Sequence, residues 1–183
     1  MSGMDRLSGK LLVAAPALLD PNFARSVVAI ADHDEEGAIG LVLNRPTDAL
    51  VADAVPGLGG LAECDSHLFI GGPVKPDAAI LVAEIDPEGE ALPVVDGIGL
   101  VRGDLDPVDL DRLAGRGRVY AGHAGWGPGQ LEGEIEREDW IVAPARGTDL
   151  LSEDPDGLWS AILTRLGGRF RLVATMPLDP SLN

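Results

Sequence analysis

Short runs of Val, Leu and Ile, separated by polar segments rich in Gly, Pro and Asp, recur along this chain. Runs of four to eight such residues between turn-forming residues are typical of β-strands. The polar segment 32–37 ends in Gly37 and predicts a hairpin turn, and segment 86–89 predicts a second hairpin between the strands that flank it. The pattern predicts strands at residues 11–15, 26–31, 38–44, 67–70, 78–84, 92–95, 118–122, 140–143 and 169–175.

Helical spacing is concentrated in the second half of the chain. After Asp154-Pro155, which suits a helix start, apolar residues recur three and four positions apart at Trp159, Ile162, Leu163 and Leu166. Similar but weaker signals predict helical segments at 48–55, 106–115 and from 127 onward. Strands therefore dominate early and helices follow without regular alternation, which favours an α+β fold with a mixed, largely antiparallel sheet and helices packed on it.

Composition adds limits to this fold. The chain has 183 residues, 45% of them hydrophobic, which fits one compact domain over residues 1–183 with an ordered core at about 7–176. The apolar runs are shorter than the roughly 20 residues that a membrane-spanning helix needs, so we expect a soluble protein. A formal net charge of −16 at pH 7 opposes binding to nucleic acid or to anionic membranes.

The single cysteine and the N-terminus bear on the cellular compartment. Cys64 has no cysteine partner in the chain, which fits a reducing cytoplasm, and we interpret it as a spare thiol. The first twenty residues resemble a short secretion signal, but Asp5 and Pro16 interrupt its basic and apolar parts. We therefore expect a cytoplasmic protein whose first apolar run is a buried strand.

Metal and cofactor sites have little support in the sequence. His33, His67 and His123 lie in separate segments, and no pair has the spacing of a zinc motif. The acidic residues around His33 lack the spacing of a calcium loop, so we interpret them as a solvated turn. We therefore expect neither a metal nor a cofactor.

The segment 122–132 is the most unusual part of the chain because it is rich in glycine and is predicted to join a strand to a helix. It has neither the lysine of a phosphate-binding loop nor the glycine spacing of a dinucleotide site, and acidic residues follow it directly. We favour a tight turn whose glycines allow close packing around Trp126. The alternative is that Trp126 is a surface anchor for a partner.

The residues Gly125-Trp126-Gly127-Pro128-Gly129-Gln130-Leu131-Glu132-Gly133-Glu134, followed by Asp139-Trp140, closely resemble the signature of the YqgE/AlgH family, an uncharacterised family of bacterial proteins. Segments 9–16, 20–28, 33–46 and 71–74 resemble the family in the same order. The resemblance implies a compact α+β fold, a cytoplasmic bacterial location and no established activity. Some family members are labelled transcriptional regulators, although an acidic chain without a basic stripe is a poor candidate for direct DNA contact.

The leading hypothesis is a non-enzymatic binding or regulatory protein that acts through a protein or small-molecule partner. Its predicted surface joins polar and glycine-rich positions at strand ends and loops, where function usually lies. These positions are His33, Asn44, Arg45, Gly71, Gly72, Gly125, Trp126, Gln130 and Glu132.

An enzyme is the main alternative to this binding protein. It would be a hydrolase or transferase of a small molecule, with His33 or His123 as general base and Glu132 or Glu134 as the carboxylate that orients it. The third hypothesis is a transcriptional regulator, for which the net charge disfavours direct DNA binding.

Overall fold

The structure is a computed structural model, and it describes residues 6–58, 67–85, 91–101 and 117–177. The strands are β1 (Lys10–Ala14), β2 (Val27–Asp34), β3 (Gly37–Val42), β4 (Pro46–Leu50), β5 (His67–Ile70), β6 (Val74–Glu84), β7 (Leu92–Val95), β8 (Ile98–Val101), β9 (Gly117–Trp126) and β10 (Trp140–Pro144). The helices are α1 (Val51–Ala54), the 3-10 helix η1 (Pro56–Leu58), α3 (Gln130–Glu136), α4 (Gly147–Leu150), α5 (Leu158–Leu166) and α6 (Phe170–Ala174).

Ten described strands form a mixed sheet in which β9 is a central member. The main order is β10-β1-β2-β3-β9-β6-β8-β7, with β5 paired to β9 and β4 paired to β5. The β5–β9 pair is parallel, and the other strand pairs among the described residues are antiparallel. The predicted α+β fold with a largely antiparallel sheet is therefore confirmed.

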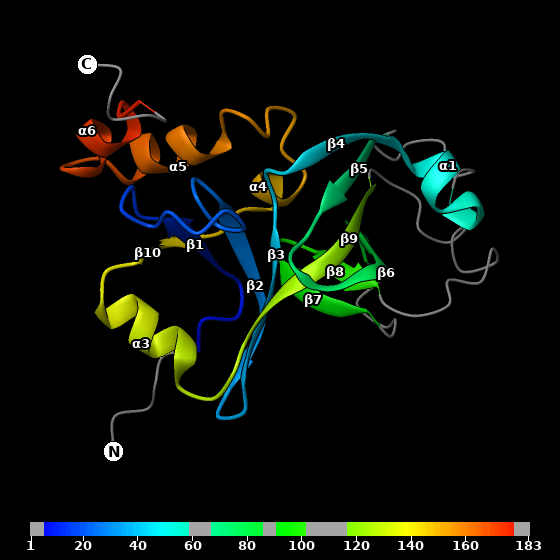
Figure 1. Cartoon of the computed structure of the whole chain (residues 1–183), viewed down its shortest axis with the longest axis horizontal. Helices are drawn as coiled ribbons and strands as arrows, with labels where there is room; N and C mark the ends of the chain where they lie inside the picture. The colour runs from blue at the N-terminus through cyan, green and yellow to red at the C-terminus, as the bar shows by residue number, and fades with distance from the viewer. Residues whose placement is uncertain (1–5, 59–66, 86–90, 102–116, 178–183) are drawn as a thin grey trace.

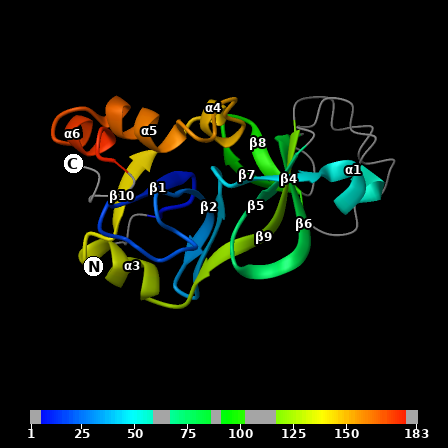
Figure 2. The same ribbon diagram turned by 45° about the horizontal axis from the view of Figure 1, so that its top comes forward.

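Helices cover both faces of the sheet at β1 and β2. Helices α5 and α6 lie on one side of these strands and α3 lies on the other (Figures 1 and 2). Because side chains alternate along a strand, Leu11 and Val13 join the apolar cluster that includes α5, while Leu12 and Ala14 join the cluster around α3. Burial on both faces explains why residues 11–14 of β1 are continuously apolar in sequence.

Residues 169–175, predicted as a closing strand, form helix α6 instead. Phe170, Val173 and Ala174 pack against the core at helical spacing, whereas Leu172 is exposed. Gly167 and Gly168 both have positive φ values, of 72° and 52°, which let the chain turn back so that α6 packs on α5. Packing on a neighbouring helix thus outweighs the β-like composition of the segment.

The predicted hairpin between 78–84 and 92–95 is also wrong. Strand β8 lies between β6 and β7, and the tight turn is at Asp96 and Gly97, which have φ values of 51° and 75°. The first hairpin is confirmed, since Asp34 pairs with Gly37 across its turn.

Three further expectations concern the ends of elements. Gly122 to Trp126, expected in a loop, complete strand β9, and Pro46 begins strand β4. The predicted helix 106–115, the turn 86–89 and Cys64 lie outside the described residues. No helix in the part of the chain that the structure describes is long and apolar enough to cross a membrane.

Candidate functional site

His33 and Glu132 join the β2–β3 hairpin to helix α3. His33 is 4% exposed, and its Nε2 lies 2.8 Å from Glu132 Oε1. The backbone N–H of Leu7 donates to His33 Nδ1 at 3.2 Å, so this nitrogen carries no proton and Nε2–H donates to the carboxylate. Both ring nitrogens of His33 are therefore occupied by hydrogen bonds within the protein.

Glu132 keeps its carboxylate charged beside this imidazole. The pKa of Glu132 is lowered, chiefly because the carboxylate accepts a hydrogen bond from its own backbone amide and also because of His33, while burial acts in the opposite direction. The Glu132 carboxylate is therefore the ionised acceptor of the hydrogen bond from His33 Nε2.

Glu134, one helical turn from Gln130, holds two tryptophans at once. Its Oε2 accepts hydrogen bonds from Trp126 Nε1 and Trp140 Nε1, each at 2.8 Å. Its Oε1 accepts a bond of 3.0 Å from Gln130 Nε2, and Gln130 Oε1 in turn accepts the Gly127 amide at 3.1 Å. One carboxylate on α3 thus fixes the ends of β9 and β10 relative to the helix.

The two indoles and Phe23 form an aromatic cluster beneath α3. Phe23 stacks on Trp126 with ring centroids 6.1 Å apart, and it meets Trp140 edge-on at 5.6 Å. Trp126 is only 6% exposed. The interpretation of Trp126 as a closely packed residue is therefore the one that fits. Its indole is buried, whereas the indole of a surface anchor for a partner would be exposed.

Asn44 and Arg45 hold the loop between β1 and β2. The buried Asn44 accepts the Val27 amide at Oδ1 and donates from Nδ2 to the Arg25 carbonyl, both at 2.9 Å. Arg45 donates to the carbonyl of Ala24, and burial lowers the pKa of Arg45. These two side chains therefore organise the backbone of the loop between β1 and β2.

Gly71 and Gly72 let the segment after β5 lie directly against β9. The Gly71 amide donates to the Ala121 carbonyl at 2.9 Å. A Cβ at Gly72, whose φ is 153°, would lie 2.2 Å from the carbonyl carbon of His123. Gly125 has more room, because the nearest atom to its Cβ position is 3.7 Å away.

The predicted surface residues therefore gather at three places. Around α3 lie His33, Trp126, Gln130 and Glu132, with Gly125 directly before Trp126 in β9. The Asn44–Arg45 pair and the Gly71–Gly72 pair lie at the two places described above.

The enzyme hypothesis pairs His33 or His123 as general base with Glu132 or Glu134, and of these pairs the structure shows that of His33 with Glu132. His33 does meet Glu132, but both its ring nitrogens are bonded, and Glu134 already accepts three hydrogen bonds. His123 directly precedes Ala124, which packs with Trp126 in the cluster around α3, so the alternation of side chains along β9 directs His123 to the opposite face. The described residues include no group of three His, Cys, Asp or Glu side chains that could hold a metal ion.

A cavity that the sequence did not indicate lies beside helix α4, and we call it the α4 cavity. Its volume is about 420 Å³, within the range of small-molecule sites. It is lined by Glu84, Ile98, Gly147, Thr148, Leu151, Ser152 and Glu153. Four residues of helix are too few to show a hydrophobic period, so this cavity could not be predicted from the sequence.

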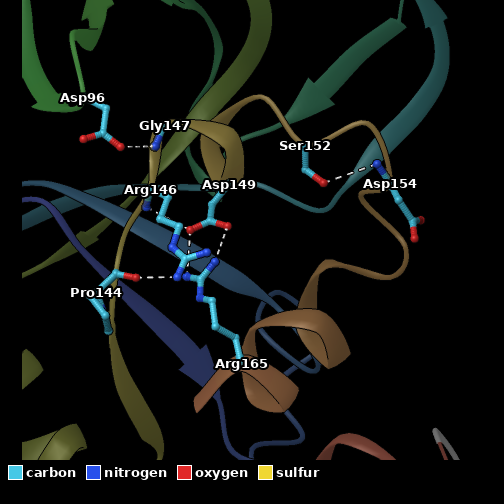
Figure 3. A network of polar contacts seen from close by, with 8 residues as sticks. All are labelled: Asp96, Pro144, Arg146, Gly147, Asp149, Ser152, Asp154 and Arg165. Carbon is cyan, nitrogen blue, oxygen red and sulfur yellow. Dashed lines mark hydrogen bonds and ion pairs between the residues drawn. The ribbon is translucent and has the colours of Figure 1, made fainter. Parts of the chain in front are cut away.

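Asp149 and Arg165 fix α4 against α5 (Figure 3). Asp149 is 5% exposed, and its two carboxylate oxygens lie 2.8 and 2.9 Å from the guanidinium nitrogens of Arg165. Asp149 Oδ2 also accepts the Arg146 amide at 2.9 Å, and Arg165 donates to the Pro144 carbonyl at 3.0 Å. The hydrogen bond to Asp149 raises the pKa of Arg165, as expected for a bidentate pair.

A second, smaller hollow lies on the β2–β3 hairpin. Its volume is about 230 Å³. The lining residues are Asp32, Asp34, Glu36, Gly37, Ala38, Ile39 and Trp126. Asp32 and Asp34 accept nearby backbone amides, from His33 at 3.0 Å and Glu36 at 2.8 Å, so their carboxylates stabilise the hairpin itself.

Known proteins align with this chain over almost its whole length. A UPF0301 protein of Streptomyces avermitilis is 46% identical, with 100% of both chains covered. A UPF0301 protein of Mycobacterium tuberculosis is 44% identical, over 96% of this chain and 90% of the relative. Neither name states an activity.

Two solved structures share the fold. A crystal structure of a Corynebacterium diphtheriae protein superposes with a TM-score of 0.82 at 30% identity, covering 96% of this chain and 95% of the other. The solution structure of the AlgH protein from Pseudomonas aeruginosa gives a TM-score of 0.73 at 26% identity, covering 97% of each chain. A family model described as AlgH-like matches residues 11–171. From this match and from relatives that align end to end, we conclude that the chain belongs to the AlgH-like family.

Proposed function

We propose that this protein is a non-enzymatic binding protein whose small-molecule partner occupies the α4 cavity. The observation that carries the proposal is the way in which α4 and the residues after it are held in place. Gly147 donates to Asp96 Oδ2 at 2.8 Å, and Asp149 binds Arg165. A helix of four residues has little stability of its own, so these contacts stabilise one fixed wall of the cavity.

Two side chains of β9 support the same wall from the sheet. Arg118 donates to the Ser152 carbonyl at 2.7 Å, and the hydroxyl of Tyr120 donates to the Leu150 carbonyl at 3.3 Å. Both side chains are buried. A wall that is fixed before a ligand arrives lowers the entropy lost on binding, which favours a binding role.

A binding role also accounts for the family signature better than catalysis does. Glu134 bonds two indoles and Gln130, and His33 bonds Glu132 and the Leu7 amide. A general base needs a nitrogen or oxygen within reach of a substrate proton. The signature residues are used to hold α3 on the sheet, which leaves recognition to another part of the molecule.

The cellular setting is part of the proposal. One cysteine in 183 residues suits the reducing cytoplasm, and a net charge of −16 argues against direct contact with nucleic acid. A regulatory effect would then pass from the bound small molecule to a protein partner.

A thermal-shift screen of a metabolite library against three proteins tests this function. Thr148→Tyr adds an aromatic ring at an exposed lining position, and Thr164→Tyr adds the same ring at an exposed position on α5 as the control. A ligand at 100 times its Kd should raise Tm by about 5–10 °C in the wild type and in Thr164→Tyr. A shift that persists in Thr148→Tyr, or a library that shifts no protein, contradicts the proposal.

A further inference from the structure

We propose that His33 is a pH-dependent switch for the N-terminal segment, residues 6–9. With one ring proton, His33 holds this segment on the β2–β3 hairpin; with two, it releases the segment and keeps its contact with α3. The inference goes beyond the proposed binding function, because neither His33 nor the N-terminal segment lines the α4 cavity. It depends on the two partners of the ring, on its burial and on the contacts that hold residues 6–9.

The ring of His33 joins two elements that lie far apart in the sequence. Its Nδ1 accepts the Leu7 amide at 3.2 Å, and its Nε2 lies 2.8 Å from Glu132 Oε1 on α3. The side chain is buried, and these two groups take both of its polar atoms. An amide N–H can only donate and an ionised carboxylate can only accept, so the arrangement needs Nδ1 without a proton and Nε2 with one.

A second ring proton is compatible with only one of these two contacts. The proton on Nδ1 would point at the Leu7 amide, so two donors would face each other across 3.2 Å. Rotation of the ring by half a turn does not remove the conflict, because both nitrogens of a charged imidazole are donors. The contact with Glu132 becomes an ion pair. Protonation therefore breaks the bond to Leu7 and strengthens the bond to Glu132.

Within the described chain, a small number of further contacts hold the N-terminal segment. The Gly9 amide donates to the Ile30 carbonyl of β2 at 2.9 Å, and the Lys10 amide donates back to the Leu7 carbonyl at 2.9 Å. Leu7 is half-buried, and both of its neighbours in the sequence are exposed. A small outward movement of the segment therefore brings the Leu7 amide to water without a change in β1.

Leu7 connects this release to the apolar cluster around α3. Its side chain packs against the cluster that contains Trp126, Leu131 and Trp140. When the Leu7 amide leaves Nδ1, its side chain moves with it, and the edge of the cluster gains exposure to solvent. Helix α3 itself stays in place, because Glu134 still holds both indoles. The switch thus changes the surface beside the family signature and leaves the packing of α3 intact.

Glu132 is the charged side chain that touches the ring. Its carboxylate stays ionised where histidines ordinarily titrate, because its pKa is lowered, chiefly by a hydrogen bond from its own backbone amide. Strand β3, which pairs with β2 at His33, has no charged residue. The other charged residues nearby in the sequence of the hairpin, α3 and the N-terminus are exposed: Asp32, Asp34, Glu136, Arg6 and Lys10. The ring proton is therefore the one whose binding changes the contact with Leu7.

An NMR pH titration of the full-length protein tests the switch. The imidazole signals of His33 report its protonation, and the chemical shift and hydrogen exchange of the Leu7 amide report the N-terminal segment. Between about pH 8 and pH 5 we expect both to change with one midpoint. The protection of the Leu7 amide, corrected for intrinsic exchange, should fall about fivefold or more, the effect of losing one hydrogen bond. The Val27 amide also donates to a side-chain acceptor, Asn44 Oδ1, and is the internal control that should not change.

Three results of this titration would overturn the inference. One is a ring that does not titrate in this range. Another is a ring that titrates while the Leu7 amide keeps its protection. The third is a change at Leu7 whose midpoint differs from that of the ring or that appears equally at Val27, because it would report a general effect of pH on the fold.

Two histidine variants separate the ring proton from other effects of pH. His33→Asn keeps an acceptor close to the position of Nδ1 but gains no charge in this range. We expect the Leu7 amide to lose its pH dependence in His33→Asn and to keep it in His67→Asn, which changes an exposed histidine on β5. A pH dependence that persists in His33→Asn would show that another group drives it and would overturn the inference. If His33→Asn does not fold, the titration of the wild type alone decides.

Discussion

Glu134 Oε2 accepts the indole N–H of Trp140 at 2.8 Å, and the same oxygen accepts that of Trp126 at the same distance. The residues of the family signature therefore serve mainly to pack α3 against the sheet. It holds α3 on the ends of β9 and β10 with one carboxylate, and its glycines allow the turn that leads into the helix.

The first prediction concerns this carboxylate. Glu134→Ala leaves two buried indole N–H groups without their acceptor, so we expect the free energy of unfolding to fall by about 2–4 kcal/mol. Urea denaturation followed by tryptophan fluorescence measures the change. Glu136→Ala, at an exposed position on the same helix, is the control and should change stability by less than about 0.5 kcal/mol. Similar losses in both variants would contradict this role of Glu134.

The second prediction concerns pH and Glu132. Because the pKa of Glu132 is lowered in the folded state, its contribution is present above the ordinary glutamate pKa and is lost as the pH falls through the folded-state value. Wild type should therefore lose more stability than Glu132→Gln between about pH 5 and pH 3. Urea midpoints at a series of pH values measure this difference, and parallel curves for the two proteins would disagree with it.

The third prediction concerns backbone contact at Gly72. Gly72→Ala places a methyl group 2.2 Å from the carbonyl carbon of His123 on a residue with φ of 153°, so the segment after β5 must move away from β9. We expect a loss of at least about 3 kcal/mol, measured by chemical denaturation. Gly57→Ala, where no atom lies within 4 Å of the new methyl group, should leave stability within about 1 kcal/mol of wild type. Tolerance of Gly72→Ala would show that this close approach is not required.

The fourth prediction concerns the support of the cavity wall. Asp149→Ala leaves Arg165 without its buried partner, and we expect a loss of about 3–5 kcal/mol in unfolding free energy. Asp156→Ala, an exposed acidic residue between α4 and α5, removes the same charge with little effect. Thermal and urea denaturation of both variants measure the contrast. An effect of Asp149→Ala no larger than that of the control would mean that this pair does not fix α4.

Much of the sheet could be predicted from the sequence because local patterns specify it. The apolar run of β1 and the acidic turn before Gly37 predict a strand and a hairpin without knowledge of distant residues. Helix α5 could be predicted in the same way, because Trp159 and Ile162 face the core three positions apart. The turn at Asp96-Gly97 between β7 and β8 is local too, but strand β8 was not predicted. The hairpin predicted between β6 and β7 was wrong because β6 pairs with β8 instead.

The site could be predicted only in part, for a related reason. Two glycines and a tryptophan at 125–127 marked an unusual segment, but the role of Glu134 depends on Trp140 in another strand. The α4 cavity depends on a contact between Asp149 and Arg165, sixteen positions apart, and on Asp96, which lies fifty-one positions before Gly147. Contacts at such separations leave no periodic signal in the chain.

The most direct test of the central claim is an amide-resolved NMR titration of the full-length protein with a compound that raises its Tm in the metabolite screen. The account predicts saturable shifts at Gly147, Thr148 and Ser152, with the amides of the β2–β3 hairpin unchanged. Shifts confined to the hairpin hollow, or the absence of saturable shifts at α4, would contradict it.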